Sequence, residues 1–168
     1  MRHGQAYPDP LHRADDRRRR AFGDAGVHRP PACHLRSKAP LGSKWLHEIK
    51  YDGYRLQIHL NKGAKIFTRN GHDWTNRFPL IAEAFEIPVE RAIFDGEVVV
   101  VHEGRTNFSE LQADLASGKQ RRMVYYAFDL LFLEGFDLRK SPQVERKRVL
   151  KMLFDEPSCR ARSCTANT

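Results

Sequence analysis

The chain has 168 residues, which suits one domain of ordinary size. Hydrophobic residues make up 40% of it and charged residues 30%, a composition that argues against wholesale disorder. No apolar run is as long as a membrane-spanning helix, and the N-terminus lacks the apolar stretch of a secretory signal. The three cysteines form no CxxC pair, which argues against a disulfide framework or a zinc site. A cytoplasmic protein with no membrane partner is therefore expected.

Positive charge is concentrated at the start of the chain. The net charge is +8, and residues 1–44 hold ten lysine and arginine residues against four acidic ones, whereas residues 45–154 hold seventeen against fifteen. The excess centres on four consecutive arginines, Arg17 to Arg20. Such a run attracts nucleic-acid phosphates without reading base sequence, but a solvated linker with no partner explains it equally well. We expect residues 1–44 to form a disordered basic arm rich in proline and arginine.

The first ordered elements are expected to be short strands. Two β-rich runs, residues 45–50 and 54–60, flank an Asp-Gly turn signal at residues 52–53. A second turn at residues 61–63 leads into a further strand at residues 64–68. This pattern predicts a series of antiparallel hairpins.

Helices and strands alternate in the middle of the chain. Phe78-Pro79 is expected to open a helix through Phe85 or Glu86, and two β-rich runs at residues 92–94 and 98–101 lie on either side of Asp-Gly-Glu. Thr106 or Asn107 is expected to cap a helix that ends near Ser117, with the following glycine as its stop.

The C-terminal part begins with an aromatic-rich apolar run at residues 123–133, which favours a buried strand. A helix is expected from Ser141-Pro142 to Phe154, with the charged run at residues 145–148 on its solvated face. Residues 155–168 have no periodicity, so we expect an irregular tail that leaves part of the edge of the strand at 123–133 unpaired. The fold class predicted is α+β, dominated by antiparallel strands.

Lys50 is the first candidate for chemistry. It follows an apolar run and precedes a tight turn, a position where partial burial and nearby cations lower the pKa of a lysine and make it a nucleophile. Gly53 permits a close approach of the backbone to a ligand, and Arg55 offers a planar set of donors to phosphate or ribose oxygens. On spacing alone, an ordinary lysine at the edge of a hairpin, beside an Asp-Gly turn, explains the pattern better than a catalytic one.

Four sequence blocks resemble one enzyme family. The Lys-x-Asp-Gly-x-Arg of residues 50–55 resembles motif I of the covalent nucleotidyltransferases, and WLHEIKYDGYR at residues 45–55 resembles the ATP-dependent DNA ligases, especially the ligase module of bacterial end-joining enzymes. Residues 67–79 resemble the second block of that family, residues 94–100 its motif III and residues 126–131 its motif IIIa. The blocks occur in the family's order over residues 45–154.

The resemblance implies an ATP-grasp-like nucleotidyltransferase fold and a covalent mechanism. Lys50 corresponds to the lysine that attacks the α-phosphate of ATP to form lysyl-AMP. Glu48 and the backbone at Ile49 correspond to the groups that meet the adenine edge. Phe128 corresponds to the aromatic ring that stacks on adenine.

Further roles follow from the same resemblance. Arg55 and Arg69 correspond to residues that hold the ribose and phosphates, and Glu97 to a carboxylate that contacts the ribose or a divalent cation, Mg²⁺ or Mn²⁺. Nicked or broken double-stranded DNA is the implied substrate in repair and recombination, end-joining proteins are implied partners, and the location would be the bacterial nucleoid. His72 and Asp73 could instead suggest a metal pair, but no further ligand stands at suitable spacing.

The family pattern also has blocks that do not occur in this sequence. Motif IV with its catalytic lysine, motif V with its Lys-x-Lys, and the C-terminal oligonucleotide-binding barrel find no counterpart in residues 155–168. We therefore expect an incomplete adenylation domain at residues 45–154, inactive or weakly active alone. Two alternatives remain open: an RNA ligase or capping enzyme, and a non-catalytic remnant that binds DNA through its basic arm.

Overall fold

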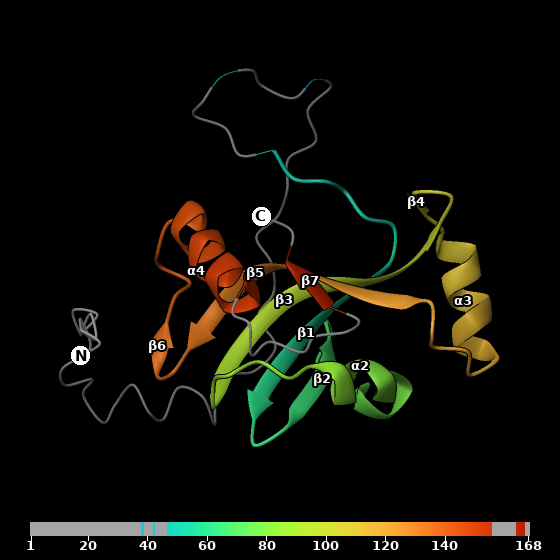
Figure 1. The fold of residues 1–168 in the computed structure, drawn as a ribbon, viewed down its shortest axis with the longest axis horizontal. Helices are drawn as coiled ribbons and strands as arrows, with labels where there is room; N and C mark the ends of the chain where they lie inside the picture. Colours follow the sequence, from blue (N-terminus) through green and yellow to red (C-terminus); the bar gives the residue numbers. More distant parts are fainter. Residues whose placement is uncertain (1–37, 39–41, 43–46, 156–163, 167–168) are drawn as a thin grey trace, which may run out of the picture.

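The computed structural model of the chain describes residues 38, 42, 47–155 and 164–166 (Figure 1). Its elements, in chain order, are β1 (Tyr54–Asn61), β2 (Ala64–Thr68), the 3₁₀ helix η2 (Thr75–Arg77), α2 (Pro79–Ala84), β3 (Arg91–His102), β4 (Arg105–Thr106), α3 (Phe108–Ala116), β5 (Met123–Leu133), β6 (Phe136–Asp137), α4 (Gln143–Asp155) and β7 (Cys164–Ala166). The basic arm expected at residues 1–44 lies outside the described residues, apart from Lys38 and Gly42.

One twisted sheet organises the described part of the chain. Its strand order is β2-β1-β3-β5-β6, with β4 paired to β3 and β7 paired to β5. All pairings are antiparallel except that of β7, which runs parallel to β5. In Figure 1, α4 lies beside β5, α2 beside β2, and α3 at the far end of β3. The prediction of an antiparallel, sheet-rich α+β fold is confirmed.

The β1–β2 hairpin closes where the sequence predicts a turn. Lys62 has a φ of 56° and Gly63 a φ of 139°, the left-handed conformations that tight hairpin turns require. Both strands begin and end within one residue of their expected bounds.

β3 is one strand of twelve residues, where the sequence favours two separate runs. The Asp-Gly pair, a common turn signal, lies in the middle of the sheet. Gly96, which has no side chain, leaves room there for the ring of Tyr125 on the next strand. A Cβ atom at Gly96 would lie 2.4 Å from Tyr125 Cζ and 2.5 Å from the Tyr126 carbonyl oxygen. The Tyr125 hydroxyl donates a hydrogen bond to the Leu56 carbonyl oxygen across this gap, 3.2 Å away. Glycine inside a strand commonly marks such a close approach.

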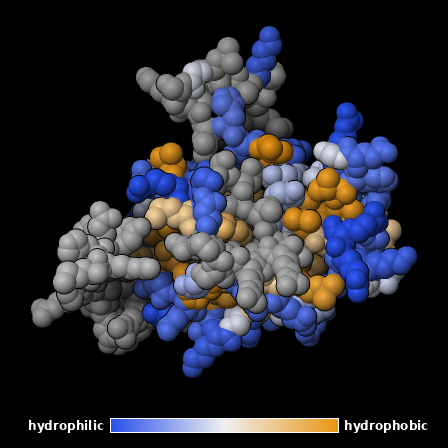
Figure 2. All heavy atoms as spheres, viewed as in Figure 1, coloured by the Kyte–Doolittle hydropathy of each residue, from blue (hydrophilic) through white to orange (hydrophobic). Residues whose placement is uncertain are grey.

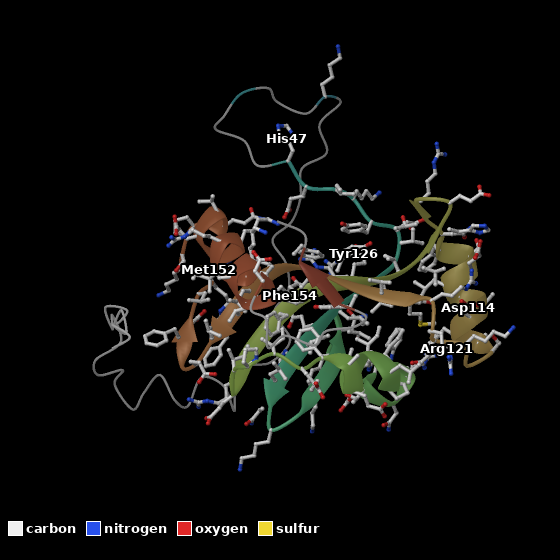
Figure 3. All side chains as sticks on the ribbon, viewed as in Figure 1. His47, Asp114, Arg121, Tyr126, Met152 and Phe154 are labelled. Atoms are coloured by element: carbon white, nitrogen blue, oxygen red, sulfur yellow. The ribbon has the colours of Figure 1, made fainter. Side chains whose placement is uncertain are left out.

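The two faces of the sheet differ in character. Even-numbered side chains of β1 and β3 enter the main hydrophobic core, where α2 and α4 cover them with Ile81, Leu150 and Phe154. Phe154, labelled in Figure 3, meets Phe94 edge-on with ring centroids 6.1 Å apart. Odd-numbered side chains of the same strands lie on the opposite face and include charged groups. The core members contributed by β1 and β3 are Leu56, Ile58, Leu60, Ala92, Phe94, Val98 and Val100.

The helices follow their predicted start and stop signals. Asn107 caps α3, because its Oδ1 accepts a hydrogen bond from the Glu110 backbone N–H at 3.1 Å, and Gly118 follows the helix with a φ of 72°. α4 begins directly after Ser141-Pro142, as expected. Among the described residues, none of the helices combines the length and apolar character needed to cross a bilayer.

Two predictions near the ends of the sheet are wrong. Residues 47–50, expected to belong to a strand, have no regular structure. The reason is that β1 pairs with β2 on one edge and with β3 on the other, so it offers no edge to the segment before it. The tail, expected to be irregular, contains β7, which pairs with Tyr125–Ala127. Together with β6, which pairs with Phe132 and Leu133, it covers part of the outer edge of β5.

Apolar surface is dispersed over the described residues. Figure 2 shows a largely hydrophilic face with separate apolar spots between the residues drawn in grey. The large apolar side chains that are exposed come from the segment before β1 and from α2, β3 and α4: Ile49, Leu80, Val101, Val144 and Met152.

Candidate functional site

The candidate site lies on the polar face of the sheet, where the segment before β1 crosses the strands. This segment, residues 47–53, approaches from above the sheet in Figure 3, where Tyr126 of β5 is labelled beneath it. Because the segment has no strand partner, side chains and single backbone groups hold it. Its position therefore depends on an aromatic stack, an ion pair and a few single hydrogen bonds.

Aromatic stacking holds the segment next to Lys50. The rings of Tyr51 and Tyr126 lie parallel within 9°, with centroids 4.6 Å apart. Burial raises the pKa of Tyr51, with smaller contributions from Tyr126 and Glu97. Lys50 itself is exposed, beside this stacked and partly buried neighbour.

Hydrogen bonds hold the end of the segment on β3 and β4. The Gly53 N–H donates to Glu97 Oε1 at 2.9 Å, and the Asp52 N–H donates to Thr106 Oγ1 at 3.1 Å. A Cβ atom at Gly53 would lie 2.2 Å from the Val98 carbonyl oxygen, so only glycine fits this close to β3. The Asp-Gly pair thus serves as a docking point of the segment on the sheet, where the sequence predicts the turn of a hairpin.

Glu97 of β3 pairs in register with Arg55 of β1 and contacts the lysine-bearing segment. Burial raises its pKa, and the hydrogen bond from the Gly53 N–H and the charge of Arg55 oppose this only in part. One of its carboxylate oxygens accepts from the backbone of the lysine-bearing segment. The same side chain can therefore position that segment and offer an oxygen to a ligand.

Arg55 is placed by two partners on neighbouring strands. Its Nε and Nη2 donate to the two oxygens of Asp95 at 3.2 and 2.7 Å, and its guanidinium lies 5.1 Å from the centroid of the Phe128 ring. Burial raises the pKa of Asp95, although the hydrogen bond and charge of Arg55 oppose it. A planar donor group and an aromatic face thus lie together on the polar face.

α4 contributes polar groups that the sequence analysis assigns to solvent. Arg146 and Lys147 point inward, with 14% and 7% of their side chains exposed, so the interpretation of residues 145–148 as a solvated face is wrong for these two. Lys147 Nζ lies 2.9 Å from Glu48 Oε1, and Gln143 Nε2 donates to the same oxygen at 3.1 Å. α4 thereby holds the other end of the lysine-bearing segment.

Arg146 links α4 to the strand that carries Phe128. Its Nε and Nη2 donate to the two oxygens of Asp129 at 2.7 and 2.8 Å, and its Nη1 donates to the Ser141 carbonyl oxygen at 2.6 Å. The hydrogen bond and charge of Asp129 raise the pKa of Arg146, with a smaller contribution from Glu48.

Not every predicted site residue joins this arrangement. Arg69 lies exposed in the turn after β2, and within the described residues no hydrogen bond or ion pair joins its side chain to the others. The side chain of Ile49 is 66% exposed, so its backbone is the part available to a ligand. Asp73 accepts hydrogen bonds from the Thr75 N–H and hydroxyl, which lowers its pKa, and the described residues contain no group of three potential metal ligands around it or elsewhere.

A separate hollow lies away from these residues. It measures about 650 Å³ and lies between the β1–β2 turn, α2 and the start of β3, where Phe85 and Ile87 line it. None of the predicted site residues lines it. The contacts among Lys50's neighbours, rather than this hollow, therefore define the candidate site.

Sequence reasoning missed the residues that hold the site together. Asp95, Tyr126 and Asp129 lie inside the family-like blocks but have no assigned role there. Gln143 and Lys147 lie outside the blocks, and their spacing of four residues on a helix is the only signal that they could act together.

Comparison with known proteins connects this arrangement with one family. The family model described as ATP dependent DNA ligase domain matches residues 35–167. The multifunctional non-homologous end joining protein LigD of Pseudomonas aeruginosa is 39% identical over 129 residues, covering 75% of this chain and 15% of that protein. A DNA ligase of Pyrobaculum calidifontis is 36% identical over 130 residues, covering 70% of this chain and 22% of that protein. The chain thus spans about a fifth or less of the length of these relatives.

Solved structures agree with the sequence comparison. The ligase domain of Mycobacterium tuberculosis LigD superposes with a TM-score of 0.58 at 27% identity, covering 72% of this chain and 38% of that chain. A mycobacterial DNA ligase D complexed with ATP and MES gives a TM-score of 0.56 at 28% identity, covering 73% of this chain and 38% of that chain.

Proposed function

Because the chain belongs to the family of ATP-dependent DNA ligase domains, we propose that it binds ATP and that Lys50 is the residue that becomes adenylated. The Nζ lone pair of Lys50 forms a bond to the α-phosphorus, the bond from that phosphorus to the bridging oxygen of the β-phosphate breaks, and pyrophosphate leaves. The amine gives up its proton, and the product is a lysyl-AMP phosphoramidate.

One observation carries this proposal: the segment around Lys50 is fixed on both sides while the lysine remains exposed. Glu48 is held by α4, and the backbone N–H of Gly53 is held by Glu97 of β3. Fixing a nucleophile before its substrate arrives lowers the entropic part of the barrier to reaction. The polar face therefore suits a reaction in which the lysine meets a phosphate from solvent.

The roles of the remaining groups follow from the resemblance to the ligase family. Phe128 stacks on adenine, and Glu48 with the backbone at Ile49 meets the edge of the base. Arg55, already beside the Phe128 ring, reaches the ribose or a phosphate. The resemblance assigns a similar role to Arg69, which lies exposed in the turn after β2 and would reach the nucleotide from there. The mycobacterial DNA ligase D that superposes on this chain is complexed with ATP, which supports these assignments.

A divalent cation fits the carboxylate present. Glu97 is a half-buried carboxylate that already accepts a hydrogen bond from the segment that carries Lys50, and Mg²⁺ commonly binds one or two carboxylates together with substrate phosphates and water. Asp95 is engaged by Arg55, which leaves Glu97 as the residue that would hold the ion. When bound, Mg²⁺ would neutralise charge on the phosphates.

DNA is the proposed acceptor of the adenylate. The relatives are named as DNA ligases and as end-joining proteins, and the basic run Arg17 to Arg20 offers a sequence-independent contact to a DNA backbone. A nicked or broken double strand is therefore the substrate class to test, together with end-joining proteins as partners.

Self-adenylation tests the proposal directly. The full chain is incubated with Mg²⁺ and ATP labelled at the α-phosphate and run on a denaturing gel; label should remain on the protein and should be lost on acid treatment, as a phosphoramidate requires. Lys50→Ala should remove the label, while the control Lys65→Ala, which changes an exposed lysine of β2, should retain it. Absence of even weak label in the unaltered chain, or label that persists in Lys50→Ala, contradicts the proposal. Equal labelling by GTP would indicate a capping-type enzyme.

A further inference from the structure

One face of α4 presents three polar side chains to the candidate site. Gln143, Arg146 and Lys147 are spaced by three and four residues, which places them on the same side of a helix. Gln143 and Lys147 both reach Glu48, and Arg146 reaches Asp129, the residue after Phe128. α4 therefore contacts both the carboxylate proposed to meet the adenine edge and the strand that carries the stacking ring.

The two partners of the Lys147–Glu48 ion pair differ in burial. The lysine side chain is 7% exposed, whereas the glutamate side chain is 39% exposed. Lysine is rarely buried this fully, because an ammonium loses much of its hydration, and burial is tolerated when a carboxylate pairs with it. The buried partner is fixed by the packing of α4, so the exposed partner takes its position from it.

One oxygen of Glu48 accepts both hydrogen bonds from α4, which leaves the other free to accept from a ligand. Both donors, Lys147 Nζ at 2.9 Å and Gln143 Nε2 at 3.1 Å, reach the oxygen Oε1. The second oxygen, Oε2, is then oriented by the first. An ionised carboxylate accepts hydrogen bonds and donates none. It can therefore accept from the 6-amino group of adenine, whereas a 6-oxo purine presents another acceptor and is repelled.

We propose that Lys147, assisted by Gln143, is a positioning residue that gives the site its preference for adenine over a 6-oxo purine by fixing Glu48. This inference rests on the proposed function, in which Glu48 meets the edge of the base. Neither α4 side chain touches the nucleotide; each acts through the glutamate.

Equilibrium binding of ATP and of inosine triphosphate to the full chain tests the inference. The two nucleotides differ at the 6-position, so the ratio of their dissociation constants reports the contact made there. We expect the unaltered chain to prefer ATP by about 10-fold or more, the range expected for loss of a charge-assisted hydrogen bond. Lys147→Met should reduce this ratio to about 3-fold or less, and Gln143→Ala should reduce it by about 2-fold.

A purely structural role predicts a different result. Loosening of the fold weakens the binding of both nucleotides and leaves their ratio unchanged. The matched control is Lys151→Met, a lysine on the same helix that is exposed and paired with Asp155, and its ratio should equal that of the unaltered chain. Glu48→Ala alone should lower the ratio, and in the Lys147→Met background it should lower the ratio only slightly further.

The outcomes separate this inference from the proposed function. An unchanged ratio in Gln143→Ala and in a folded Lys147→Met overturns the inference, even when Lys50 is labelled. If Lys147→Met does not fold, as judged by circular dichroism, Gln143→Ala decides, because that side chain is exposed and its loss leaves the fold intact. A ratio near one in an unaltered chain that labels Lys50 also overturns it. Failure of the unaltered chain to bind ATP overturns both.

Discussion

The ion pair between Arg146 and Asp129 provides a test of how α4 is held on the sheet. Arg146→Met keeps most of the volume of the side chain and removes its charge. The variant leaves the Asp129 carboxylate, 14% exposed, with the hydrogen bond from the Leu130 backbone N–H and near the like charge of Asp95. A buried carboxylate that loses its partner is strongly destabilising.

The expected loss of stability is about 3 kcal/mol. Breaking a buried pair by removing one partner costs roughly 3–5 kcal/mol, and the lower end applies because both side chains retain some exposure and Asp129 keeps one donor. With a urea dependence of roughly 1–3 kcal/mol per molar, the midpoint of urea unfolding should fall by about 1–3 M. The assay is urea unfolding followed by circular dichroism.

Two further variants serve as controls for the Arg146–Asp129 ion pair. Arg148→Met removes a neighbouring arginine that is 72% exposed and paired with Glu145, and it should change stability by less than about 0.5 kcal/mol. The double variant Asp129→Asn with Arg146→Met removes both charges and should recover about 1–2 kcal/mol of the loss. An Arg146→Met protein within 1 kcal/mol of the unaltered chain, or a double variant less stable than Arg146→Met, would refute the argument.

Two more predictions concern the middle of β3. Gly96→Ala should destabilise the protein by about 3 kcal/mol in thermal unfolding, because the new Cβ would lie 2.4 Å from the ring of Tyr125; a loss below 1 kcal/mol would contradict this. Burial raises the pKa of Glu97 above its ordinary 4.5, so its contribution to stability is fully present below pH 4.5 and is lost as the pH rises through the raised pKa. The free energy of unfolding of the unaltered chain minus that of Glu97→Gln should therefore fall above pH 4.5, by at most about 1.4 kcal/mol per pH unit, and a flat or rising difference excludes this role.

The parts of the fold that the sequence predicts well are those decided by local physics. The left-handed turn at Lys62-Gly63, the Asn107 cap of α3 and the aromatic-rich run of β5 depend on residues close together in the chain. The position of residues 47–50 is not decided locally, because both edges of β1 are paired with other strands. Likewise, Gly96 separates two β-rich runs in the sequence, and only the position of the Tyr125 ring across it shows that they form one strand.

The candidate site divides in the same way. Its family-like blocks can be recognised from sequence because the residue types and spacings are themselves the signal. The role of α4 in holding Glu48 cannot be recognised from sequence, because a lysine and an arginine beside Glu145 on an amphipathic helix normally face water. Their inward orientation follows from carboxylates at Glu48 and Asp129, which are 99 and 17 residues away from their respective partners in the chain.

The absence of a strand partner for residues 47–53 has a consequence for how the protein can change. Strands of a sheet share backbone hydrogen bonds, so a substitution in one of them propagates to its neighbours. The lysine-bearing segment is instead held by a tyrosine stack, an ion pair and single hydrogen bonds to Glu97 and Thr106. Each attachment can be altered with the β ladder intact, so the handling of nucleotide and the stability of the scaffold can vary independently during evolution.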